Sequence, residues 1–328
     1  MSITKTETND ACEDNDIRRI RGGGSQWGIF LGFVAIMLVF SLSSKYFFTL
    51  DNFLNIAKQA SINAIIAFGM TMVLVSGGID LSVGSIVALS VVIMATMMKN
   101  GTPAGLGLLI GIGIGVMAGL VNGVLIARVK LAPFIVTLGS VSYLRGLALV
   151  YTKGMPVYGL PSAVRWFGNG SLWIIPTPVA VAAIIAIISN FLLKHTHFGE
   201  YATAIGGNEE AARLSGVNVA KYKIMVYVFS GICSVIAAII LMARINAAEP
   251  IAGNGFELDA IAAAVMGGTS LSGGVGSIIG TVIGALIIAA LRNGLNLLNV
   301  DANWQQVAIG VVIILAVIID KVRNSKDK

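Results

Sequence analysis

The chain has little charge for its length. Only 12% of its 328 residues are Asp, Glu, Lys or Arg, whereas 56% are hydrophobic. A soluble globular domain usually has about 25% charged and about 45–50% apolar residues. The apolar residues also form long runs, which are not typical of a large soluble helical protein. The composition therefore predicts an integral membrane protein.

Cysteines and catalytic motifs are also scarce. The two cysteines are Cys12, in a polar tail, and Cys233, inside an apolar run, so we expect no disulfide and no metal site. The sequence has no GxxxxGK[ST] phosphate loop and no GxSxG motif. We therefore expect no catalytic residue and no cofactor bound by this chain. The net charge of +6 is attributed to loops at a membrane surface, not to nucleic-acid binding.

The apolar runs predict an all-α, multi-pass membrane protein with about ten transmembrane helices. A helix needs about 20 residues to cross the hydrocarbon core. One run has only eleven residues and ends at Gly267–Gly268, as expected of a short, discontinuous helix. The expected spans are 26–44, 57–76, 81–98, 104–127, 133–151, 176–193, 224–243, 257–267, 276–292 and 303–320.

Ten spans place both termini on one side of the membrane, together with the loop at 194–223. Most of the 22 Lys and Arg residues fall on that side, which the positive-inside rule assigns to the cytoplasm. We expect a cytoplasmic tail over 1–25, a membrane domain over 26–320 whose longest cytoplasmic loop is 194–223, and a second tail over 321–328. The first span has no small-residue cleavage site and is expected to stay in the membrane.

Glycine recurs at every fourth position in two of the spans. Such stripes let helix backbones approach closely in lipid. The stripes consist of Gly111, Gly115, Gly119 and Gly123 in one span and Gly276, Gly280 and Gly284 near the other end of the chain. In addition, GGIDLSVGS at 77–85 is echoed weakly by GGTSLSGGVGS at 267–277. Paired backbone breaks of this kind often frame the substrate path of a transporter.

Asp80 lies between two spans that have no polar loop between them. An ionised group at membrane depth is costly and usually faces a bundle interior or a cavity. It is either a helix cap, accepting N–H bonds from the span that begins at Leu81, or a hinge or pathway residue. The expected residues of the substrate pathway are Asn63, Gly77, Gly78, Asp80, Thr269 and Ser270.

A polar segment, NEEAARLSGVNVAKYK, occupies 208–223 between two apolar runs. Asn208 is a good N-cap, Glu209 and Glu210 suit the first turn of a helix, and Gly216 is expected to end it. The segment is either an ordinary interfacial helix or a rigid contact for a cytoplasmic partner. The residues of this expected contact are Asn208, Glu209, Glu210, Ala211, Ala212, Arg213 and Gly216.

The pattern EAAxxxG, from Glu210 to Gly216, resembles the loop by which permease subunits of bacterial ABC importers contact their ATPase. The resemblance covers nearly the whole chain from residue 46, through SGGIDLSVGSIVALS, APFIVTLG and ELDAIAAAVMGGTSLSGGVGSIIGT. It is greatest to the monosaccharide-importer permeases, and to ribose permeases among them. One departure is that no Leu-Pro follows the EAA segment, as it does in maltose-type permeases.

The resemblance implies a permease subunit in the bacterial inner membrane, paired with a second permease copy as a homodimer. Its other partners would be a cytoplasmic ATP-binding subunit, which holds ATP and Mg²⁺, and a periplasmic sugar-binding protein. Lys153, Arg165 and Arg244 are expected on the outer side, where they would face an acidic docking surface or lipid headgroups.

Other substrates stay open, namely a branched-chain amino acid, a sugar alcohol or a signalling furanose. A self-sufficient carrier fits less well, because few ionisable residues lie within the spans to relay protons. A membrane enzyme acting on lipids or quinones would need a reactive polar cluster, and none is evident in the sequence.

Overall fold

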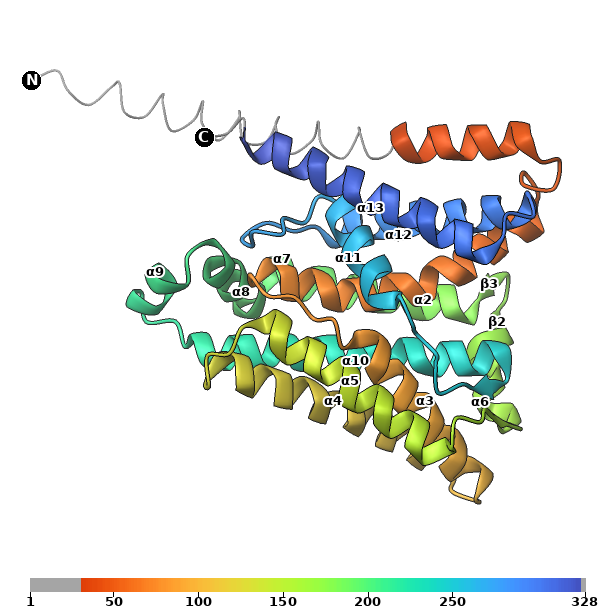
Figure 1. The fold of residues 1–328 in the computed structure, drawn as a ribbon, viewed down its shortest axis with the longest axis horizontal. Coiled ribbons are helices and arrows are strands. Elements are labelled where there is room, and N and C mark those ends of the chain that lie inside the picture. Colours follow the sequence, from red (N-terminus) through yellow and green to blue (C-terminus); the bar gives the residue numbers. More distant parts are fainter. Residues whose placement is uncertain (1–30, 326–328) are drawn as a thin grey trace, which may run out of the picture.

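The computed structural model describes residues 31–325 of the chain, and in this part it is almost entirely helical (Figure 1). The N-terminal tail over 1–25 and the start of the first expected span lie outside the described residues. The helices are Leu31–Ser43, α2 Leu50–Val75, α3 Val83–Lys99, α4 Ala104–Ala127, α5 Pro133–Thr152, α6 Ser162–Asn169, α7 Thr177–His195, α8 His197–Gly207, α9 Glu209–Leu214, α10 Val219–Ile245, α11 Phe256–Met266, α12 Ile278–Leu297 and α13 Ala302–Ser325.

Two short antiparallel strand pairs join loops of the bundle. Strand β1 (Val157–Tyr158) pairs with β4 (Ala247–Ala248), and β2 (Ser171–Leu172) pairs with β3 (Ile175–Pro176). Each strand has two residues, so the all-α fold class predicted from the sequence is confirmed.

Six helices are long and apolar enough to cross a membrane, namely α2, α4, α5, α7, α10 and α12. The helix Leu31–Ser43 and α3 are apolar but shorter. These helices confirm a multi-pass helical membrane protein, while the total of ten spans and the cytoplasmic termini stay predictions. Figure 1 shows α13 running back toward the end of the bundle occupied by α8 and α9, hereafter the α9 end.

Some expected boundaries were wrong. Helix α2 starts at Leu50 instead of residue 57, because Thr49 caps it by accepting a hydrogen bond from the Asn52 N–H. Its first two turns are too polar to stand out in hydropathy. Helix α10 starts at Val219, after the N-cap Asn218. The basic stretch up to Lys223 is therefore its first turn and not part of a loop.

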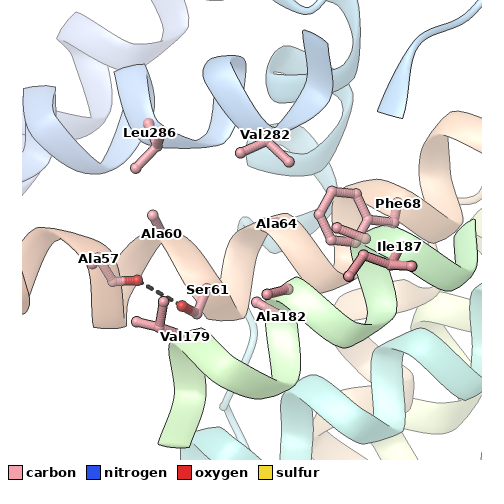
Figure 2. Close-up of a pocket in the computed structure, with 12 residues that line it drawn as sticks. Ala57, Ala60, Ser61, Ala64, Phe68, Val179, Ala182, Ile187, Val282 and Leu286 are labelled. Carbon is pink, nitrogen blue, oxygen red and sulfur yellow. Dashed lines mark hydrogen bonds between the residues drawn. The ribbon is translucent and has the colours of Figure 1, made fainter. Parts of the chain in front are cut away.

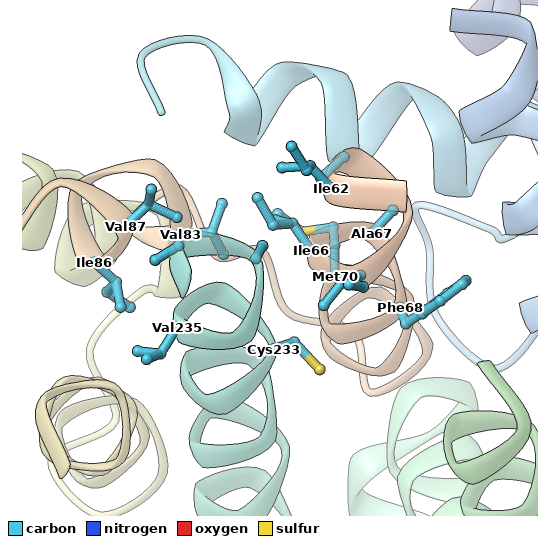
Figure 3. Close-up of a cluster of buried hydrophobic side chains, with 14 of the residues drawn as sticks. Ile62, Ile66, Ala67, Phe68, Met70, Val83, Ile86, Val87, Cys233 and Val235 are labelled. Carbon is cyan, nitrogen blue, oxygen red and sulfur yellow. The ribbon is translucent and has the colours of Figure 1, made fainter. Parts of the chain in front are cut away.

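The core lies where α2, α3 and α10 meet. Figure 3 shows Ile66 and Met70 of α2, Val87 of α3, and Cys233 and Val235 of α10 in this cluster. All five side chains are at most 1% exposed. Helix α2 is therefore the central element, whereas α7 leaves several large apolar side chains uncovered, as expected of a helix that faces lipid.

The glycine stripes are packing surfaces, as predicted. A Cβ at Gly115 of α4 would meet the carbonyl oxygen of Gly231 on α10, and one at Gly231 would meet the carbonyl oxygen of Gly115. Gly119 is equally close to the Tyr227 backbone. On the other side of the bundle, Gly280 of α12 faces Gly267, at the end of α11. The helices touch along their backbones at these positions.

The discontinuous helix is also confirmed. Helix α11 has eleven residues and ends at Gly267, before Gly268 with a φ of +88°. The non-helical stretch 246–255 leads into it, and Gly253 of that stretch packs on the backbone of Gly84 in α3. The interrupted backbone is thus covered by protein, as the absence of water in a bilayer requires.

Candidate functional site

Helix α9 is capped at both ends as its sequence predicts. The Asn208 side chain accepts a hydrogen bond of 2.9 Å from the Ala211 N–H. Gly216 has a φ of +86°, its N–H donates to the Arg213 carbonyl, and the Val217 N–H donates to the Ala212 carbonyl. These two bonds form the glycine-terminated helix end that such a left-handed residue permits.

Helix α9 carries exposed ion pairs. Arg213 donates two hydrogen bonds to the Glu210 carboxylate, of 2.5 and 2.9 Å, and Lys223 of α10 donates to Glu209 at 2.5 Å. The bonds from Arg213 hold the pKa of the Glu210 carboxyl below its usual range and raise the pKa of Arg213. Exposed pairs of this kind add little to stability. They fix the side-chain positions on a surface that is open to a partner.

The predicted loop 194–223 contains a second helix, α8, that the sequence analysis missed. It ends at a backbone contact between three distant segments. A Cβ at Gly206 would meet the Val75 carbonyl oxygen and the Gly274 nitrogen, and the Gly274 N–H donates to that same carbonyl at 2.9 Å. Gly77 and Gly273 also lie against Gly206. We call Val75–Gly77, Gly206 and Gly273–Gly274 the glycine junction.

The glycine junction joins α9 to both backbone breaks. Helix α8 leads through Gly207 and Asn208 directly into α9. Val75 ends α2 before the break that contains GGIDLSVGS, and Gly273–Gly274 belong to GGTSLSGGVGS. The second of the two echoing segments is therefore hydrogen-bonded to the residue that lies two positions before the first. For Gly206, the third member of the junction, the only sign in the sequence was the pair of glycines that precedes Asn208.

Asp80 is the centre of a buried polar network. One carboxylate oxygen accepts hydrogen bonds from the backbone N–H and the hydroxyl of Ser82, at 3.0 and 2.5 Å. The other accepts from the Ser230 hydroxyl of α10 at 2.8 Å. Asn122 of α4 donates to the Ser82 hydroxyl at 2.9 Å and accepts from Ser140 of α5 at 2.5 Å. The network thus ties the start of α3 to three other helices.

The backbone bond from Ser82 agrees with the predicted capping role of Asp80, although the N-cap residue of α3 is Ser82 itself. Asp80 has no exposed surface in the single chain. The sequence analysis missed the distant members of this network, which are Asn122, Ser140 and Ser230. A polar amide in an apolar span, as at Asn122, was the available signal.

The predicted pathway residues are spread along the bundle in the part of the chain that the structure describes. Gly77 lies at the glycine junction, and a Cβ at Gly78 would meet the Tyr227 hydroxyl. Thr269 and Ser270 follow α11, and both are buried. Asn63 is buried in α2, fourteen residues from Gly77, which corresponds to about 21 Å along a helix.

Charged residues cluster around the start of α11. Asp259 lies in the first turn of this helix, and its carboxylate accepts hydrogen bonds from Arg292 of α12 at 2.8 and 3.0 Å. Arg145 of α5 donates to the Ala252 carbonyl at 2.7 Å and so supports the stretch before α11. The guanidinium of Arg145 therefore has a backbone acceptor within the bundle.

The three expected docking residues lie at the end of the bundle opposite α9. Lys153 ends α5 with a φ of +53°, and Arg165 is exposed on α6. Arg244 is half-buried in the last turn of α10. Helix α6 is fixed on α10 because Asn169 donates to the Ala243 carbonyl at 2.9 Å. Within residues 31–325, no group of three or more His, Cys, Asp or Glu side chains is placed to hold a metal ion.

A bundle of apolar helices with two covered backbone breaks defines a multi-pass membrane protein of the permease class. Residues 52–317 match the family described as branched-chain amino acid transport system / permease component. The chain belongs to this family, which places it in the inner membrane.

Curated relatives match along most of the chain. The ribose import permease protein of Bacillus subtilis is 46% identical over 300 residues, covering 91% of this chain and 93% of the relative. The ribose import permease protein of Escherichia coli K12 is 45% identical over 294 residues, covering 88% and 92%. The D-allose transport system permease protein of the same strain is 40% identical over 298 residues, covering 90% and 91%. No solved structure matched the chain.

Proposed function

We propose that the chain is the membrane-spanning permease subunit of an ABC-type importer, and that it carries ribose or a closely similar monosaccharide. This proposal rests on the sequence identity of 40–46%, over about nine-tenths of the chain, to permeases named for ribose and D-allose import. The family description names branched-chain amino acids, but these relatives are named for the import of sugars.

Helix α9 is the proposed contact for a cytoplasmic ATP-binding subunit. Its polar side chains are exposed, and Glu209 and Glu210 are held in place by Lys223 and Arg213. Ala212 is buried against the chain and anchors the helix. In the sequence, no phosphate loop supplies an energy source, so ATP and Mg²⁺ would be bound by that partner.

The glycine junction is the proposed route by which movement of α9 reaches the membrane. Backbone touches backbone at Gly206, Val75 and Gly274, so no flexible side chain separates the three segments. A displacement of α8 and α9 would therefore shift the ends of both broken spans together. Rocking of rigid helix groups around such breaks is how transporters alternate access.

The substrate path is proposed to lie between two copies of the chain. Asn63, Asp80 and Thr269 are all buried in the single chain, so none of them opens onto a path in one chain alone. A homodimer with both α9 helices at one end would present Lys153, Arg165 and Arg244 at the other. Those residues are the proposed docking positions for a periplasmic sugar-binding protein.

Reconstitution in liposomes tests the proposal. The purified chain would be reconstituted alone, and then with its ATPase and binding protein, and uptake of radiolabelled ribose, allose, xylose and leucine would be measured. We expect ATP-dependent uptake of ribose only in the complete system. Glu210→Lys should abolish uptake without changing the unfolding temperature. The control is Glu200→Lys on α8, which alters another exposed acid of the same end outside the EAA segment.

Three results would contradict the proposal. Accumulation by the chain alone would remove the need for an ATPase, and uptake of leucine instead of ribose would assign the chain to the amino-acid branch. Full uptake by Glu210→Lys would remove α9 from the coupling contact.

Arg165→Glu should raise the binding-protein concentration needed for half-maximal uptake, and an unchanged value would exclude Arg165 from docking.

A further inference from the structure

A short apolar hairpin lies between α6 and α7, at the end of the bundle opposite α9. Strands β2 and β3 form it by pairing within residues 171–176, and Figure 1 shows both strands at that end. The base of the hairpin is closed by a hydrogen bond of 3.0 Å from the Thr177 N–H to the Gly170 carbonyl. The hairpin 171–176 is thus fixed directly at the start of α7.

The side chains around the tip of this hairpin are exposed. Four consecutive apolar residues lie there, each at least half exposed in the single chain, namely Leu172, Trp173, Ile174 and Ile175. Trp173 is 95% exposed and has a φ of +59° at the first position of the two-residue turn. A positive φ at this position normally selects glycine, and for a bulky residue it is an outlier. The chain thus keeps a tryptophan where the backbone favours glycine, which points to a role for the indole ring.

Helix α7 defines the depth of the hairpin in the membrane. Its 19 residues extend over about 28 Å, and the hydrocarbon core of a bilayer is about 30 Å thick. The helix ends with the exposed Lys194 and His195, and such polar side chains lie at the membrane boundary. Thr177 therefore lies at the opposite boundary. The hairpin extends at most about 7 Å beyond it, which keeps the tip within or beside an interfacial layer of about 5–7 Å.

Helix α7 also has one face toward the bundle and one toward lipid. Figure 2 shows Ala182 on the side of α7 that faces α2. Ile184, Ile188 and Phe191 lie about 180–240° around the helix from Ala182, and all three are exposed. Such large side chains are typical of contact with lipid, because membrane helices meet each other mainly at small residues. The hairpin is therefore continuous with a helix whose outer face contacts lipid.

We propose that the hairpin 171–176 is an anchor in the membrane interface of the leaflet opposite α9, with the indole ring of Trp173 at the level of the lipid headgroups. Tryptophan is enriched at this level because its ring has an apolar body and an N–H donor. The neighbouring Leu172, Ile174 and Ile175 contact the upper parts of the acyl chains. The anchor fixes the level of α7 in the bilayer, and that of α6, which ends shortly before the hairpin.

The composition of the tip favours lipid over a protein that docks and leaves. The segment GSLWIIP, residues 170–176, contains no charged residue. A binding protein that leaves after each delivery would return four apolar side chains to water, which is unfavourable. Lipid covers them throughout the transport cycle. This anchor requires only that the chain spans a membrane, so it is independent of which solute is carried.

Quenching of tryptophan fluorescence in lipid nanodiscs tests the anchor. The chain has four tryptophans, namely Trp27, Trp166, Trp173 and Trp304. The probe is the full chain in which phenylalanine replaces all of them except Trp173. The quenchers are aqueous acrylamide and phosphatidylcholine that carries bromine either near its ester groups or near the ends of its acyl chains.

Two control chains carry their single tryptophan elsewhere. In Leu214→Trp it replaces a residue of α9 that is 74% exposed. In Ile188→Trp it lies on the outer face of α7, about 16 Å along the helix from Thr177 and so near the middle of the bilayer. The first control reports on water and the second on the hydrocarbon core.

We expect bromine near the ester groups to quench Trp173 about twofold more strongly than bromine near the chain ends, because indole rings lie at headgroup level. Ile188→Trp should show the reverse order, and acrylamide alone should quench Leu214→Trp. Quenching of Trp173 by acrylamide alone would assign the hairpin to a soluble partner, and quenching by neither agent would assign it to a second copy of the chain. Either result would refute the anchor. Should the substituted chain fail to fold, the difference between the unaltered chain and Trp173→Phe gives the same measurement.

Discussion

Asp80 shows how one side chain holds a broken span in place. A carboxylate has about four acceptor positions, and three of those on Asp80 are used by Ser82 and Ser230. In apolar surroundings each such bond matters more than in water, because a buried group left unpaired loses its hydration without compensation. The break after α2 can therefore turn inside the bundle without leaving its polar groups unsatisfied.

Asp80→Asn keeps the size of this side chain but replaces one acceptor oxygen with an NH₂ donor. Either Ser82 or Ser230 then loses its acceptor, at an expected cost of about 1–3 kcal/mol. Thermal unfolding in detergent should show the loss as a lower midpoint, and Ser230→Ala should show a smaller one. An unfolding midpoint equal to that of the unaltered chain would contradict the structural role. Lost uptake at an unchanged midpoint would favour the pathway role that was predicted from the sequence.

The helices of this bundle are held together by the shape of their surfaces. In lipid, contact between apolar side chains gains little free energy over contact with lipid. Helices therefore associate mainly through van der Waals packing where their backbones approach closely. Helices α4 and α10 meet in this way, with Gly115 and Gly231 facing each other's carbonyl oxygens. A four-residue spacing keeps all the glycines of a stripe on one helix face.

Gly115→Ala tests this contact. The added methyl group has no room beside Gly231 and should destabilise the protein by about 1–3 kcal/mol. Gly113→Ala is the control, since a Cβ there meets nothing within 4 Å, and it should leave stability within about 0.5 kcal/mol. Thermal unfolding of both variants measures the difference. Equal midpoints would mean that the two backbones do not meet at Gly115.

At the scale of the whole bundle, the glycine junction connects α9, the proposed contact for the ATP-binding subunit, to the membrane-spanning helices. The three segments come from positions near residues 75, 206 and 274, which are far apart in the sequence. Packed interfaces shift between discrete arrangements and do not deform continuously. A junction in which backbone packs directly on backbone is well suited to passing a small displacement from α9 to both breaks at once.

Gly206→Ala should lower stability, as Gly115→Ala does, and should also uncouple transport in the molecules that fold. Its Cβ would separate α8 from Val75 and Gly274. A bias of about 1.4 kcal/mol between access states changes their populations tenfold, so we expect uptake to fall about tenfold while the ATPase still binds. The adjacent Gly207→Ala is the control, because its Cβ meets nothing within 4 Å. Equal uptake by the two variants would refute a role for the junction.

Local signals in the sequence predicted local structure correctly. Asn208 and Gly216 bound α9 as expected, because caps and left-handed glycines act within one turn. The short helix before Gly267 was found for the same reason. Helices α6 and α8 were missed, since neither is long nor continuously apolar. The polar network around Asp80 was missed because its other members, Asn122, Ser140 and Ser230, lie 42 and more residues away in the sequence. Hydropathy carries no information on which faces of two spans meet.

The amino-acid sequence by itself determined that this chain is a helical membrane protein, where its spans are interrupted, and which glycines face other helices. Composition and short-range spacing are enough for those properties, because lipid imposes a length and a polarity on every span. Only the tertiary structure decided that Gly206, Val75 and Gly274 meet and that the polar network around Asp80 joins four helices. Those contacts depend on how whole helices pack against one another, and packing is a property of surfaces brought together from distant parts of the chain.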